Sequence, residues 1–280
     1  MRTIFLGLKL LISLAIIEFR KPPYLRSKPI SLKKLVMGPL TLSRFIKVTK
    51  HFIHFTTTQK QQEEIIYWFF QMSSLIEKGF GDKDNPVVLT LENFPDIIML
   101  KSIGYNNVLI GELTDTIRHI KKLTSGNYNY DSFERNIIKT WLTHKVRDAK
   151  QTGNETISID NALRAAEDRG SSYFLALVYL LNPTNLNESS ERLIRLSGAW
   201  FQIIDDHDDR KKDIGHRNTP FTVSPDNLHK EMRKKYMAKY QKEIQAITSC
   251  RTYPLIIFFR GLAGLVTIKP MVFGEKSDWH

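Results

Sequence analysis

A helical period of apolar residues runs through most of this chain. Apolar side chains recur every three to four positions in segments such as EEIIYWFFQMSSLIEK (63–78) and SSERLIRLSGAWFQII (189–204). Glycine is scarce, with 14 residues in 280, and the alternating, turn-bounded segments typical of strands do not recur. The sequence therefore predicts an all-α fold, with helices at about 32–50, 59–78, 92–101, 106–123, 131–150, 160–181, 188–212, 226–248 and 254–267.

The sequence predicts one helical domain that follows an apolar N-terminal segment. No linker-like stretch interrupts residues 22–280, so we expect a single domain there. Residues 1–21 contain FLGLKLLISLAII, which Lys9 interrupts and which is too short to span a bilayer comfortably. We interpret 1–21 as an apolar N-terminal helix that packs or lies on a membrane surface; an export or anchor signal is the alternative. The basic run that follows suits an anionic membrane surface.

The charge of the chain indicates an anionic partner. The formal net charge is +12 and the isoelectric point is near 9.6, which suits phosphorylated small molecules, anionic membranes or nucleic acid. The basic residues are spread along the chain, and no nucleic-acid-binding signature is present, so nucleic acid is not expected as a partner. A single cysteine, Cys250, excludes an internal disulfide and fits a reducing, cytoplasmic location.

Five aspartates are concentrated in the segment FQIIDDHDDRKKD (201–213). On a helix, Asp205, Asp209 and Asp213 share one face. Like charges at this spacing cost about 0.2–0.5 kcal/mol per pair, a cost that a divalent cation such as Mg²⁺ would offset. The alternative is a solvated acidic helix end whose charge is balanced by the basic residues 210–212.

Three segments resemble motifs of trans-prenyl diphosphate synthases. Residues 201–209 resemble the family's second aspartate-rich motif, FQxxDDxxD. The segment RGSSYF (169–174) is similar to a KTGxLF-like segment whose lysine binds diphosphate. The segment DIGHRNTP (213–220) resembles D-L-x-x-G-K-x-x-x-P, with Arg217 in the place of the lysine. The resemblance covers roughly residues 24–222 and is most specific at 201–209.

The family's first aspartate-rich motif, DDxxD, is altered in this sequence. It should fall about 90 residues before Arg169, where the chain reads SLIEKGFGDKD (74–84). Glu77 and Lys78 replace the paired aspartates, and the two arginines that follow in the family are absent. Glu77 and Asp82 are candidates for a replacement carboxylate face; a plain polar loop is the alternative.

The resemblance implies a class I isoprenoid synthase, a bundle of antiparallel helices around a central cavity. It would act on prenyl diphosphates, either as a prenyltransferase or by terpene-synthase-type ionisation of an allylic diphosphate. The implied catalytic residues are also the implied Mg²⁺ ligands: Asp205, Asp206 and Asp209, with Glu77 and Asp82 as further candidates. The implied diphosphate-binding residues are Arg169, Gln202, Arg217, Lys33 and Lys34.

Two further hypotheses stay open beside the enzyme. The altered first motif fits a catalytically impaired partner subunit of a prenyl diphosphate synthase, so the resemblance predicts either a homodimer or a heterodimer with a related synthase. The apolar segment 1–21 and the basic run after it fit a membrane-associated, lipid-binding helical protein. The sequence favours the enzyme, because an intact acidic motif strains a helix unless it binds a cation.

Overall fold

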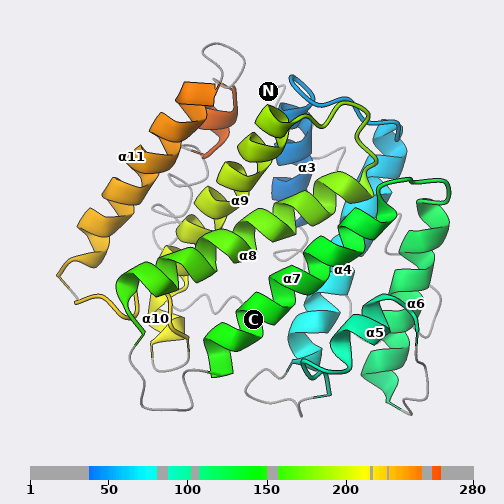
Figure 1. Cartoon of the computed structure of the whole chain (residues 1–280), viewed down its shortest axis with the longest axis horizontal. Coiled ribbons are helices and arrows are strands. Elements are labelled where there is room, and N and C mark those ends of the chain that lie inside the picture. The colour runs from blue at the N-terminus through cyan, green and yellow to red at the C-terminus, as the bar shows by residue number, and fades with distance from the viewer. Residues whose placement is uncertain are drawn as a thin grey trace.

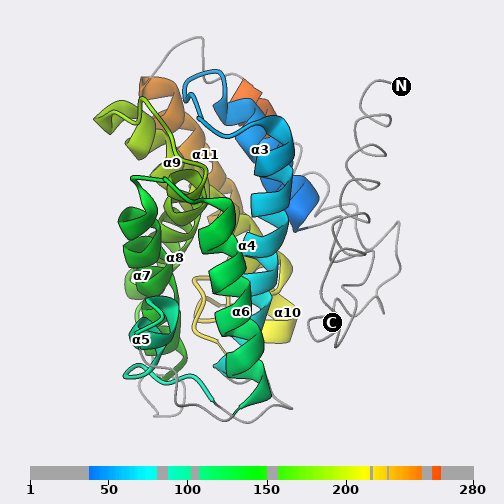
Figure 2. The same cartoon turned by 90° about the vertical axis from the view of Figure 1, so that its right-hand side faces the viewer.

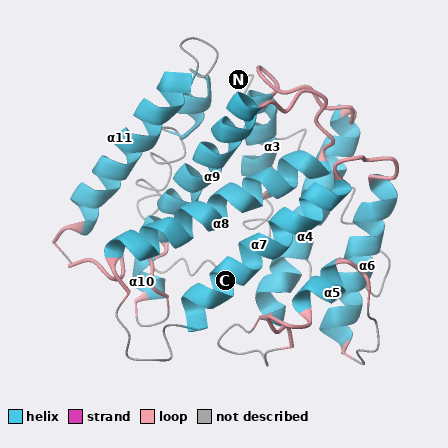
Figure 3. Cartoon of the chain, viewed as in Figure 1, coloured by secondary structure: helices cyan, strands magenta, loops and turns pink. Residues whose placement is uncertain are grey.

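A computed structural model describes residues 38–80, 88–101, 107–149, 157–214, 217–225, 227–247 and 254–259. These residues form helices and no strand; an isolated antiparallel bridge pairs Phe55 with Pro183. The prediction of an all-α fold is therefore confirmed (Figure 3). Segment 1–21, Lys33, Lys34 and Asp82 lie outside the described residues.

The helices follow the predicted segments closely, as Figure 1 shows. Their bounds are α3 Pro39–Thr49, α4 Gln59–Gly79, α5 Phe94–Ile98, α6 Val108–Leu123, α7 Tyr130–Ala149, α8 Ile159–Leu180, α9 Glu188–Asp208, α10 Arg210–Asp213 and α11 His229–Ile247. A short helical segment also covers 254–259. The continuous helix predicted at 188–212 is wrong in one respect, because the structure breaks it at Asp209. The like charges around Asp209 disfavour an uninterrupted helix there.

Several helix starts are set by side chains that cap the first turn. Thr58 and Gln61 form a capping box at the start of α4, in which each side chain accepts a hydrogen bond from the backbone N–H of the other. The side chains of Asn107, Ser158 and Asn187 accept backbone N–H groups at the starts of α6, α8 and α9. Such caps stabilise a helix by about 1 kcal/mol each, so local sequence determines where these helices begin.

Helix α8 lies at the centre of the arrangement. It packs between α7 and α9, and α11 packs on the outer side of α9 (Figure 1). Helix α4 packs against α6 and α3, and it also contacts α8. Figure 2 shows α3, α4 and α6 as a layer beside α7 and α8. The two layers meet where α4 faces α8.

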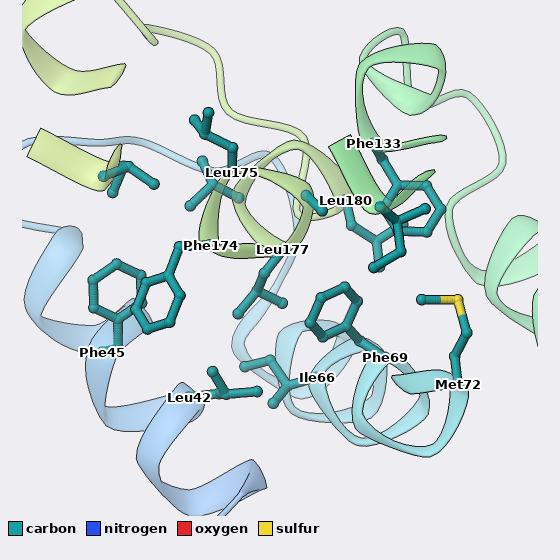
Figure 4. Close-up of a cluster of buried hydrophobic side chains, with 14 of the residues drawn as sticks. Leu42, Phe45, Ile66, Phe69, Met72, Phe133, Phe174, Leu175, Leu177 and Leu180 are labelled. Carbon is teal, nitrogen blue, oxygen red and sulfur yellow. The ribbon is translucent and has the colours of Figure 1, made fainter. Parts of the chain in front are cut away.

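Aromatic and aliphatic side chains fill the interface between these layers (Figure 4). Phe45 of α3, Phe69 of α4 and Phe174 of α8 are fully buried. The rings of Phe45 and Phe174 meet edge to face, with centroids 4.5 Å apart. Burying each such side chain contributes about 1.5–3 kcal/mol. This core therefore fixes how α3 and α4 sit against α8.

A glycine pair allows α8 and α9 to approach very closely. A Cβ atom on Gly170 would lie 2.7 Å from the carbonyl carbon of Gly198, and one on Gly198 would lie 2.6 Å from the carbonyl carbon of Gly170. Both neighbours are backbone atoms, which cannot rotate away. Any side chain larger than hydrogen at either position must therefore push the two helices apart.

We expect Gly198→Ala to lower the free energy of unfolding by about 1–3 kcal/mol, the usual cost of overpacking. Urea unfolding followed by circular dichroism measures this change. The matched control is Gly111→Ala in α6, because a Cβ atom at Gly111 would meet nothing within 4 Å. The control should be neutral or stabilising by up to about 1 kcal/mol, because alanine favours a helix over glycine. Equal effects of the two substitutions would contradict a close α8–α9 contact.

Candidate functional site

Polar side chains from α4, α8, the end of α9, α10 and the segment after α10 converge at one place. Three of these contributions are pairs spaced four residues apart, so the two side chains of each pair project to the same side; Asp209 is the residue that ends α9. The pairs are Ser73 with Glu77, Arg169 with Tyr173, and Asp205 with Asp209. Together with Gln202, Asp206, Asp213 and Arg217 they form what we term the polar cluster.

Arg217 connects the two ends of the polar cluster. Its Nη2 lies 3.5 Å from Oε1 of Glu77 on α4, across 140 positions of the chain. Its Nη1 lies 3.7 Å from Oδ1 of Asp213 at the end of α10. Arg217 is mostly buried, with 22% of its side chain exposed. Arg217 therefore connects the segment where the first aspartate-rich motif is altered, at Glu77, with the segment that follows the second motif, at Asp213.

A second link joins α4 to α8 inside the polar cluster. The Ser73 hydroxyl lies 3.3 Å from the Tyr173 hydroxyl, close enough for a hydrogen bond between them. Burial raises the pKa of Tyr173 to about 12, and the charges of Arg169, Glu77 and Asp205 also act on it. Tyr173 therefore stays protonated at neutral pH and stands among charged groups from three helices.

Gln202 organises the aspartates of α9. Its side-chain Nε2 donates a hydrogen bond of 2.8 Å to Oδ1 of Asp206 and lies 3.4 Å from Oδ2 of Asp205. Asp206 is only 2% exposed, so this amide satisfies an acceptor that is otherwise hidden from water. The Gln202 amide nitrogen thus contacts carboxylates, and its role in this arrangement is to orient them.

Asp205 carries the strongest electrostatic perturbation in the polar cluster. Its pKa rises from 3.8 to about 8, first because protein surrounds it, and then because of the negative charges of Asp209 and Asp206. Arg169 opposes this rise. The Asp205 side chain nevertheless remains exposed to solvent. Because Asp205 is exposed, water and small ions can reach its carboxylate.

Arg169 is half-buried on α8. Its guanidinium carbon lies 5.8 Å from the centroid of the Trp141 ring on α7, a distance at which a cation is attracted to the ring face. Its neighbour Gly170 makes the close contact with α9. The charge of Arg169 acts on Asp205 of α9 and favours its ionised form.

His207 lies on a different side of α9 from the polar cluster. Its ring meets the edge of Phe221 at 5.1 Å and lies 5.8 Å from the ring of His229 on α11. Burial and the positive charge of Arg233 lower the pKa of His207 to about 4. This histidine is therefore neutral at physiological pH and packs toward α11.

The structure places most of the predicted site residues together. The residues that lie in the polar cluster are Glu77, Arg169, Gln202, Asp205, Asp206, Asp209 and Arg217. Lys33, Lys34 and Asp82 fall outside the described residues. Sequence reasoning placed Asp213 on the same helix face as Asp205 and Asp209, but it did not select Ser73 or Tyr173 as site residues. Each stands one helical turn from a residue that it did select, and that spacing was the available signal.

The polar cluster suits a hydrated divalent cation better than an enclosed metal site. Among the described residues, no three histidine, cysteine or acidic side chains are gathered closely enough to hold a metal by themselves. Mg²⁺ usually keeps several waters and binds through one or two carboxylates together with substrate phosphates. Asp205 is accessible and lies beside further carboxylates, so the donor set fits that mode of binding.

Comparison with known proteins gives no further assignment. No protein-family model matches the sequence, and neither the curated proteins nor the solved structures include a match. In the described part of the chain, no helix has the length and apolar character needed to cross a membrane. The functional assignment therefore depends on the motifs and on the geometry of the polar cluster.

We expect Asp205→Asn to raise the Tm of the metal-free protein at pH 8. The unfolded chain releases the Asp205 proton near pH 3.8, whereas the folded protein holds it until about pH 8. The charged carboxylate therefore destabilises the fold increasingly as the pH rises through this window. Differential scanning fluorimetry between pH 4 and 8 should show a difference in Tm that is largest at pH 8 and vanishes toward pH 4.

The control is Asp115→Asn, because Asp115 makes an exposed surface ion pair with Arg118, and such pairs contribute little to stability. This control should leave the pH dependence of the Tm unchanged. Added Mg²⁺ at pH 8 should raise the Tm of the original chain more than that of Asp205→Asn. A difference in Tm that does not vary with pH would contradict the electrostatic account of Asp205.

Proposed function

We propose that this chain is an Mg²⁺-dependent class I isoprenoid synthase that acts on prenyl diphosphates. The observation that carries the proposal is the convergence of Glu77, Arg169, the aspartates of α9 and Arg217 in one polar cluster. The motif resemblance selected these residues from separate segments of the chain. An arrangement of carboxylates opposite arginines is what a metal-bridged diphosphate requires.

In the proposed mechanism the arginines and the aspartates divide the binding of substrate. Arg169 binds the diphosphate through its planar guanidinium, which can donate two parallel hydrogen bonds to phosphate oxygens. Arg217 contributes a second guanidinium when its ion pair with Glu77 is replaced by a contact with the diphosphate. Asp205 and Asp209 would hold Mg²⁺, and Gln202 keeps Asp206 in place beside them. The chemistry that Mg²⁺ would supply there is positive charge for the diphosphate leaving group.

Apolar rings next to the polar cluster suit the hydrocarbon part of such a substrate. The rings of Phe69 and Tyr173 lie 4.9 Å apart, and those of Phe174 and Phe201 lie 5.2 Å apart. Phe69 and Phe174 are fully buried, while Tyr173 and Phe201 are partly exposed. The site therefore passes from charged groups to aromatic surface within one helical turn. Aromatic surface excludes water and attracts an allylic cation through the ring faces.

The altered first motif favours a reaction with a single substrate. On α4, Glu77 is the carboxylate that faces the polar cluster, and it contacts Arg217. The two arginines that bind the second diphosphate in the resembling family are absent from this sequence. We therefore favour ionisation of one allylic diphosphate, followed by rearrangement or capture by water, over condensation with isopentenyl diphosphate.

We expect the purified chain to release diphosphate from geranyl or farnesyl diphosphate only when Mg²⁺ is present. Dimethylallyl, geranyl, farnesyl and geranylgeranyl diphosphates would each be tested with and without isopentenyl diphosphate. Released diphosphate is quantified, and gas chromatography with mass spectrometry identifies the organic products. Hydrocarbons or alcohols without isopentenyl diphosphate indicate terpene synthesis. Longer prenyl diphosphates indicate elongation.

Variants connect this activity to the polar cluster. Asp205→Ala combined with Asp209→Ala should abolish turnover, and Arg169→Ala should lower kcat/KM on the order of 10²-fold, the cost of removing one electrostatic contact in a transition state. Asp115→Asn should retain full activity, because Asp115 pairs with Arg118 on the surface. Absence of turnover in the folded original chain would overturn the proposal of an active enzyme and support the hypothesis of a non-catalytic partner subunit.

A further inference from the structure

The outward face of α11 carries five exposed lysines. Tyr236, Tyr240 and Ile244 form the buried stripe with which α11 packs against α9. The exposed lysines stand on the remaining face: Lys230, Lys234, Lys235, Lys239 and Lys242. The exposed acid on this helix is Glu231. We term these five lysines the α11 basic face. They span three turns of one helix, so their positive charges add over a continuous surface.

The α11 basic face stands at the edge of the molecule. In Figure 1, α11 is the outermost helix on its side and packs along α9. Two of its side chains also reach Glu167 of α8. The Lys239 Nζ donates a hydrogen bond of 2.7 Å to Oε1 of Glu167 on α8. The Tyr240 hydroxyl donates to the same carboxylate at 2.6 Å. These contacts hold the orientation of α11 and pair Lys239 with α8. Lys230, Lys234, Lys235 and Lys242 remain exposed on the helix.

The composition of the α11 basic face matches an anionic lipid surface. Lysines are compact, strongly hydrated charges that attract an anionic surface without fixed geometry. Recognition of single-stranded nucleic acid needs exposed aromatic rings for stacking, and both tyrosines of α11 are buried against the core. Leu228, just before α11, is 38% exposed and adds an apolar side chain at one end of this face.

We propose that the α11 basic face docks the protein onto an anionic lipid bilayer. The docking is electrostatic and reversible, with the lysines at the level of the lipid headgroups. It is independent of the polar cluster, because His207 and the buried stripe of α11 separate the two. The proposal therefore stands or falls separately from the assignment of an isoprenoid substrate.

The test is flotation of the full chain with vesicles of phosphatidylcholine alone and of phosphatidylcholine mixed with phosphatidylserine. We expect binding only to the mixed vesicles, and weaker binding as salt increases. The test variant replaces Lys230, Lys234, Lys235 and Lys242 with glutamine and leaves Lys239 with Glu167. Each lysine near an anionic surface contributes about fivefold to partitioning, so this variant should bind at least about tenfold more weakly.

The matched control replaces four exposed lysines of other helices with glutamine and removes the same charge. Its positions are Lys47 of α3, Lys50 just after α3, Lys60 of α4 and Lys139 of α7. Both variants keep residues 1–37, so that segment contributes equally to each. Circular dichroism checks that both variants fold. Equal losses in the two variants, binding that ignores phosphatidylserine, or preferential binding to duplex DNA in a competition assay would each overturn the proposal.

Discussion

The close contact between Gly170 and Gly198 controls where the charged groups of this protein can stand. With hydrogen as the only side chain at both positions, the backbones of α8 and α9 touch. Arg169 precedes the first glycine, and Gln202 and Asp205 follow the second by one and two turns. A wider separation would move Arg169 away from Asp205 and weaken the attraction that opposes the rise in the Asp205 pKa. The crossing of two helices thus sets the electrostatics of the site.

The polar cluster concentrates negative charge in a way that costs stability. Aspartates spaced one turn apart repel one another, and enclosure by protein raises the pKa of Asp205 further. Gln202, Arg169 and Arg217 compensate part of this cost through a hydrogen bond, an attraction across the helix crossing and an ion pair. In the proposed function, a bound Mg²⁺ would offset the repulsion that remains.

Prediction from sequence succeeded where the signal was local. The apolar period and the capping residues located α4, α6, α8 and α9 to within about two residues, apart from the end of the last. The break at Asp209 was missed because periodicity continues through it while the repulsion between neighbouring acids acts against the helix. Ser73 and Tyr173 were missed as site residues because their meeting depends on how α4 packs against α8.

The sequence by itself determined the fold class, the helix positions, and the spacing that puts Asp205 and Asp209 on one face. These follow from interactions between residues a few positions apart, and such interactions are visible along the chain. Only the tertiary structure decided that Glu77 meets Arg217, that Gln202 turns toward Asp206, and that the lysines of α11 face outward together. Each of these depends on which helix faces are buried. The packing of the whole core decides which helix faces are buried. Apolar burial is non-directional, so the sequence of one helix does not specify which other helix it packs against.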